Sequence, residues 1–112
     1  MPRGHIERFT LLNYPTTGSG AGPWVDVAGL DTLAIQVASA SPNLTITWQG
    51  SIDGTSAGSV LATPVSGTAA ATAANPADDA LFFVDVSALT HFRANVTAFT
   101  SGSVGAAAVG AY

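Results

Sequence analysis

Apolar and polar side chains alternate along several short stretches of the chain. The clearest stretch spans residues 44–49, and the same alternation recurs in residues 32–38, 81–86 and 92–98. A period of two is typical of a β-strand with one face on a hydrophobic core. The residues predicted to face inward are Leu33, Ile35, Val37, Leu44, Ile46, Trp48, Phe82, Val84, Val86, Phe92, Ala94, Val96 and Ala98.

One longer pattern occurs twice. VDVAGLDTLAIQV at residues 25–37 returns as VDVSALTHFRANV at residues 84–96. Each copy has a short β-branched run, a turn of small residues closed by Leu, and a longer alternating run, which predicts a strand, a tight corner and a second strand. Two such units in 112 residues predict one all-β domain with two quasi-equivalent halves.

Turn signals separate the remaining strands. Asp53-Gly54 is a turn pair whose glycine accepts a positive φ, and residues 100–103 predict a hairpin turn. Residues 66–80 are mostly small and polar, and we expect them to form a loop or strand edge that is the most mobile part of the chain. About eight short strands with Gly, Pro and Asn turns predict a single Greek-key or jelly-roll-like β-sandwich.

The first 23 residues are predicted to be an N-terminal arm and connector, followed by the sandwich domain at residues 24–112. Residues 5–12 form a possible first strand without a clean period of two, and residues 14–23 are rich in Pro and Gly. Fifteen extended residues reach on the order of 50 Å, enough to cross onto a neighbouring subunit. The alternative is a first strand that completes the chain's own sheet.

Composition makes protein contacts the expected role of the surface. Charged residues make up 9% of the chain, which has no lysine or cysteine and a formal charge of −4. A weakly charged surface repels neighbouring molecules poorly, so contact with another protein or with further copies is expected. A weakly charged monomer is the alternative.

The same composition argues against several classes of partner. Nucleic-acid binding requires clustered Lys or Arg, which this acidic chain lacks. We expect no membrane span, because no apolar run approaches about 18 residues. The amino terminus shows no apolar signal-peptide core, so synthesis and assembly are expected in the cytoplasm.

Catalytic and metal-binding groups are sparse. His5 and His91 are the only candidate bases, and His91 occupies an outward strand position. Asp26 and Asp85 recur at equivalent places and suggest paired carboxylates, but an Asp just before a turn is more simply explained by bonds to local backbone amides. Residues 75–79 offer oxygen ligands for calcium without the spacing of a calcium motif. We therefore expect no enzyme activity, cofactor or metal.

Aromatic residues offer one further possibility. Trp24 and Tyr14 flank the connector, where exposed rings would form a platform on which sugars stack. Trp48 lies on the apolar side of its strand and is better placed in the core. No polar cluster in the sequence supports carbohydrate binding.

Four segments together resemble small β-sandwich proteins of tailed bacteriophages and prophages. The segments are WVDVAGL at 24–30, WQGSIDGT at 48–55, FVDVSAL at 83–89 and FRANVTAFTSGSV at 92–104, within a resemblance that covers residues 24–110. Ala57-Gly58 stands where an aromatic residue often follows the Asp-Gly turn. The resemblance implies a virion component: a head decoration or cement protein, or a fibre or tail module.

The leading hypothesis is a non-enzymatic capsid cement or decoration protein that stabilises the head by binding between capsid subunits. Its expected partners are the major capsid protein and copies of itself, with a trimer at a local threefold as one arrangement, and its expected location is the capsid surface. The alternative is a tail, fibre or vertex module that binds a host receptor or glycan. The residues predicted to make contacts are Arg3, His5, Ile6, Arg8, Phe9, Tyr14 and Trp24.

Overall fold

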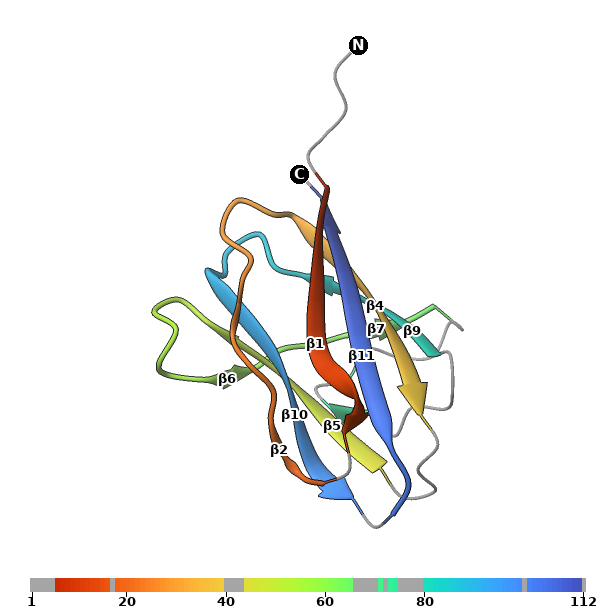
Figure 1. Ribbon diagram of the computed structural model, residues 1–112. Helices are drawn as coiled ribbons and strands as arrows, with labels where there is room; N and C mark the ends of the chain where they lie inside the picture. The colour runs from red at the N-terminus through yellow and green to blue at the C-terminus, as the bar shows by residue number, and fades with distance from the viewer. Residues whose placement is uncertain are drawn as a thin grey trace.

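The computed structural model describes residues 6–16, 18–39, 44–65, 71, 73–74, 80–99 and 101–111. These residues form two antiparallel sheets that pack into a sandwich, as predicted (Figure 1). The strands are β1 (Ile6–Thr16), β2 (Gly20–Ala21), β3 (Val25–Asp26), β4 (Thr32–Ser39), β5 (Leu44–Ser51), β6 (Gly58–Ser59), β7 (Thr63–Pro64), β8 (Ala73–Ala74), β9 (Ala80–Asp85), β10 (His91–Phe99) and β11 (Val104–Ala111).

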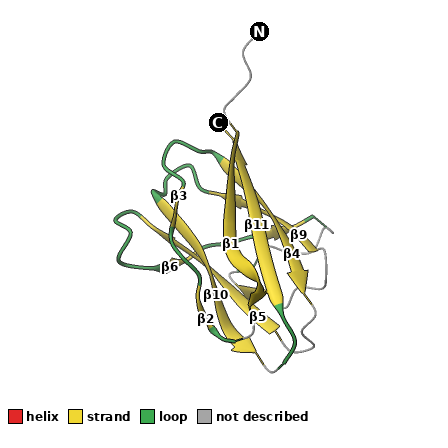
Figure 2. Cartoon of the chain, in the orientation of Figure 1, coloured by secondary structure: helices red, strands yellow, loops and turns green. Residues whose placement is uncertain are grey.

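Sheet A has the strand order β1-β11-β4-β9-β7, and sheet B has the order β2-β10-β5-β6, with β3 on β10 and β8 on β5. The strands outnumber the predicted eight because five of them contain only two residues. The described residues contain no helix (Figure 2), and accordingly none that is long and apolar enough to span a membrane.

The core lies between the sheets and contains nearly all the residues predicted to face inward. Trp48 is fully buried, with its ring centroid 5.2 Å from that of Phe82 and 6.4 Å from that of Phe92. The prediction is wrong for Ala98, which is exposed. A register shift between Val96 and Ala98 reverses the alternation, so that Phe99 packs against the core instead.

The repeated motif builds the two corners that carry the chain between the sheets. The short strand of each copy pairs with the long strand of the other copy: β3 pairs with β10, and β9 pairs with β4. Asp26 lies opposite His91, and Asp85 lies opposite Thr32, which are equivalent positions in the two copies. The predicted quasi-equivalent halves therefore exchange strands with each other.

Backbone hydrogen bonds at the corners follow the same exchange. Val27 N–H donates to Thr90 O at 2.9 Å, and Val86 N–H donates to Asp31 O at 2.9 Å. Within each turn, the N–H of the closing leucine donates to the carbonyl oxygen of the valine three residues earlier: Leu30 to Val27, and Leu89 to Val86. The two corners are thus held together by equivalent hydrogen bonds to each other. This explains why the same sequence pattern occurs twice.

Residues 6–16 form a strand of the sandwich. For these residues the prediction of a free arm is wrong, and the alternative prediction, a first strand that completes the chain's own sheet, holds. β1 pairs antiparallel with β11 from Ile6 to Thr16. A register shift around Leu11 places both Leu11 and Leu12 in the core, which explains the missing period of two. Residues 1–5 lie outside the described residues.

The connector after β1 packs tightly on both sheets. Gly22 N–H donates to Ala94 O at 2.8 Å, and a Cβ at Gly22 would collide with the carbonyl oxygen of Leu11. Only glycine fits between these two backbones, so Gly22 fixes the end of the connector against both sheets.

The expected turns have different outcomes. Gly54 has a φ of 76°, as the Asp-Gly pair predicts. The predicted hairpin at residues 100–103 is wrong, because β10 lies in sheet B and β11 in sheet A, so this segment crosses between sheets. Most of residues 66–80 lie outside the described part of the chain.

Candidate functional site

The recurring aspartates serve the corners, as predicted. Asp26 Oδ1 accepts a hydrogen bond from Ala28 N–H at 3.0 Å, and Asp85 Oδ1 accepts one from Ser87 N–H at the same distance. The Ser87 backbone bond, followed by its hydroxyl, lowers the pKa of Asp85, so this carboxylate stays ionised at neutral pH. Within the described ranges no three His, Asp or Glu side chains gather as metal ligands.

A third aspartate organises the loop after β5. Asp53 Oδ1 accepts hydrogen bonds from Thr55 N–H at 2.8 Å and Ser56 N–H at 2.9 Å, and one from the Ser51 hydroxyl. The Ser56 and Thr55 amides, together with the Ser51 hydroxyl, lower the pKa of Asp53 to about 2. This carboxylate therefore shapes a turn and is a poor proton acceptor in catalysis.

Trp24, Gln49, His91 and Arg93 form an aromatic–cation cluster on the outer face of sheet B. The Arg93 guanidinium carbon lies 4.2 Å from the centroid of the Trp24 ring, and Arg93 Nε donates to Gln49 Oε1 at 2.7 Å. His91 meets the Trp24 ring edge-on, with centroids 6.4 Å apart. All four side chains are half-buried.

The surroundings hold His91 and Arg93 in place. Thr90 Oγ1 and His91 Nδ1 share a hydrogen bond of 2.8 Å, and the backbone at Gly54 lies against the imidazole ring. Arg93 has no acidic partner among the residues that the structure describes. A positioned guanidinium without a counter-ion suits a carboxylate or phosphate supplied from outside the chain.

The sequence predicted an outward position for His91 on its strand but did not bring His91, Arg93 and Gln49 together. That pairing depends on the register of β10 on β5, in which Arg93 lies opposite Gln49. Such a register is long-range and leaves no local sequence signal. Trp24 was singled out, and the structure makes it the centre of the cluster.

Sheet A presents a different surface, which we call the apolar face: Ala34, Val65, Leu81, Phe83 and Val109. Phe83 is 48% exposed and Val109 is 41% exposed. Val109, Ala34 and Phe83 form one row across β11, β4 and β9. Leu81 lies two residues from Phe83 on the same side of β9, and Val65 N–H donates to its carbonyl.

We did not predict this apolar face, although the sequence of β9 contains a signal for it. Leu81 and Phe83 alternate with the inward Phe82 and Val84, so β9 is apolar on both sides. Such a strand is expected when both of its faces are covered. Contiguous apolar residues at a surface mark a protein contact more often than scattered ones do.

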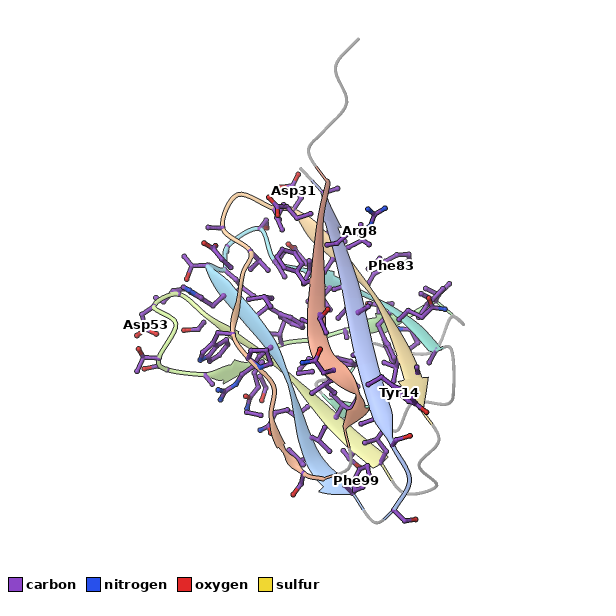
Figure 3. All side chains as sticks on the ribbon, viewed as in Figure 1. Arg8, Tyr14, Asp31, Asp53, Phe83 and Phe99 are labelled. Atoms are coloured by element: carbon purple, nitrogen blue, oxygen red, sulfur yellow. The ribbon has the colours of Figure 1, made fainter. Side chains whose placement is uncertain are left out.

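A shallow hollow of about 490 Å³ lies beside Phe83 at the end of β9. Asp31 and Asp85 line it together with Thr63 and Ser87. Figure 3 shows Arg8 and Phe83 among the side chains of sheet A. Arg8 lies on β1, in the same cross-strand row as Val109, and is exposed.

Of the residues predicted to make contacts, those that the structure describes do not form one site. Arg8 and Tyr14 are exposed on β1, Phe9 packs partly against the core, and Trp24 lies between β2 and β3, beside Arg93 of sheet B. The Tyr14 hydroxyl accepts a 3.1 Å hydrogen bond from Ser103 Oγ. Arg3, His5 and the side chain of Ile6 lie outside the described part of the structure.

This sandwich, with two sheets joined by exchanged corners, is a fold found in prophage proteins. The SPBc2 prophage-derived protein YomS superposes with a TM-score of 0.84 at 11% identity, over 100% of this chain and 97% of YomS. The PBSX exported protein XepA superposes with a TM-score of 0.89 at 11% identity, over 100% of this chain and 39% of XepA. No protein-family model matches the sequence, and no curated protein does.

Proposed function

We propose that the chain is a non-enzymatic structural protein of a bacteriophage particle, and that it acts as a cement or decoration protein on the capsid surface. The observation that carries this proposal is the apolar face of sheet A. Val65, Leu81, Phe83 and Val109 are all about half exposed on a chain with few charges. Such a surface gains free energy when another protein covers it.

Two further features support the same role. Asp26, Asp53 and Asp85 accept hydrogen bonds from backbone amides in turns, which gives these three carboxylates a structural role. Sandwiches of this fold occur in the prophage proteins YomS and XepA. A cement protein needs a rigid domain whose small contacts add up around the shell, and the exchanged corners supply that rigidity.

Binding to capsids tests the proposal. Purified protein is added to particles of the parent phage that lack it, and bound protein is measured after sedimentation as its concentration rises. We expect saturable binding and a higher temperature of capsid disruption, because each bound copy stabilises the assembled shell over free subunits. Absence of saturable binding to intact heads overturns the capsid role.

The aromatic–cation cluster favours a second candidate, a tail, fibre or vertex module that binds a host glycan. An indole ring beside a fixed guanidinium and an amide combines an apolar surface with hydrogen-bonding groups. The guanidinium of Arg93, which has no acidic partner among the described residues, favours a sugar that carries a carboxylate. In XepA the sandwich is only part of a longer chain, as a binding module is expected to be.

Retention on an array of acidic and neutral glycans tests this candidate. We expect retention by sugar acids that is lost in Trp24→Ala and in Arg93→Gln, since each change removes one half of the cluster. Tyr14→Ala is the matched control, because Tyr14 is an exposed aromatic residue on the other sheet. Equal retention of wild type and Arg93→Gln excludes the cluster as a sugar-acid site.

A further inference from the structure

We infer that two copies of the chain pack face to face through the outer face of sheet A, with Arg8 of each copy seated in the acidic hollow beside Phe83 of the other. The partner is therefore a second copy of this chain. The inference rests on the proposed function for its biological role. It makes the apolar face a contact between two copies within the assembly on the capsid, and it leaves the contact with the shell to other surfaces of the pair.

On the outer face of sheet A, the positive and the negative charges lie at opposite edges. Arg8 lies on β1, and the hollow with Asp31 and Asp85 lies at the end of β9. Arg8 has no hydrogen-bond or ion-pair partner in the described part of the chain. Between these charges the row Arg8–Val109–Ala34–Phe83 spans three strand spacings, about 14 Å.

A twofold axis parallel to the strands, between β11 and β4, makes this face complementary to itself. The axis exchanges β1 with β9 and β11 with β4, so Arg8 faces the Phe83 side of the second copy. At the centre, Val109 faces Ala34 of the second copy, a larger side chain against a smaller one. In the adjacent row, Gln36 of one copy likewise faces the smaller Ala107 of the second copy.

Charge selects this arrangement over the other twofold pairing. An axis across the strands would place β1 on β1 and β9 on β9, so Arg8 would not reach the aspartates of the second copy. The axis along the strands forms two Arg8–aspartate contacts instead. Arg8 can also stack on the exposed ring of Phe83, as guanidinium groups do on aromatic faces.

Sedimentation of the purified protein at concentrations on the order of 100 µM tests the interface. We expect wild type to sediment as a dimer or an assembly of dimers, and Phe83→Arg to sediment as a monomer, because the new charge would face Arg8 of the second copy. Ile52→Arg is the matched control, because Ile52 is an apolar residue that is 76% exposed on a loop beyond sheet B. It should leave the assembly unchanged. Circular dichroism checks that every variant is folded.

A charge exchange tests the specific contact. Arg8→Glu and Asp31→Arg should each weaken self-association by about tenfold or more, because each homodimer then holds like charges in contact. Mixed in equal amounts, the two variants should associate as tightly as wild type. The mixed dimer contains one native Arg8–Asp31 pair and one exchanged pair, whereas neither variant alone can form either.

The possible results separate this inference from the proposed function. Wild type that is monomeric, or folded Phe83→Arg that associates like wild type, overturns the inference. Failure of the mixed variants to associate overturns the Arg8 contact. Because these measurements use the isolated protein, a dimer that does not bind capsids overturns the proposed function alone, and a monomer that binds capsids overturns this inference alone.

Discussion

Removal of residues 1–15 is expected to unfold the sandwich. The deletion takes away nearly all of β1, including the fully buried Leu11 and the nearly buried Leu12. Burial of two leucine side chains contributes roughly 3–6 kcal/mol. That is a large share of the roughly 5–15 kcal/mol by which a domain is stable, before the lost pairing with β11 is counted. Thermal unfolding followed by circular dichroism should show no cooperative transition above 25 °C.

Removal of residues 1–5 alone is the matched control, because β1 begins at Ile6. This shorter deletion should unfold cooperatively within a few degrees of the full chain. A chain without residues 1–15 that keeps the wild-type transition would show that β1 is dispensable for the fold. The first segment would then act as the arm that the sequence alone permits.

Replacement of Trp48 by alanine is expected to lower the free energy of unfolding by about 3–5 kcal/mol. Trp48 is the largest fully buried side chain, and it contacts Phe82 from sheet A and Phe92 from its own sheet. Its loss leaves a cavity at the contact between the two layers. In a domain of this size the melting temperature should fall by more than about 12 °C.

Trp48→Phe should cost clearly less than Trp48→Ala. Nε1 of Trp48 is buried and finds no hydrogen-bond partner among the described residues, so phenylalanine removes an unsatisfied donor while keeping an aromatic ring. Ile52→Ala, at an exposed position, should stay within about 0.5 kcal/mol of wild type. A Trp48→Ala variant as stable as the Ile52 control contradicts the packing described for this core.

The alternation of apolar residues predicted the strands and their inward faces because strand burial is a local property. Leu44, Ile46 and Trp48 are buried as expected. Local chemistry also predicted the turns that Asp26 and Asp85 form. Ala98 and Leu11 were misjudged or left undecided because a bulge changes the alternation, and nothing in the residues around it marks its place.

The pairing of distant segments could not be predicted from sequence. The repeat was visible, but the exchange of strands between its copies depends on contacts between residues near 26 and 91 and between residues near 85 and 32. Both candidate surfaces arise in the same way. Gln49 meets Arg93, and Val109 lies beside Ala34, only because their strands pair in a particular register.

The number of copies of this chain per purified virion tests the proposed capsid role most directly. Quantitative mass spectrometry gives the ratio of this chain to the major capsid protein. A ratio near one is predicted, because a cement or decoration protein covers the whole shell. A ratio of a few per cent would contradict the capsid role and place the chain in the tail, vertex or fibres, where glycan binding through Trp24 and Arg93 becomes the better explanation.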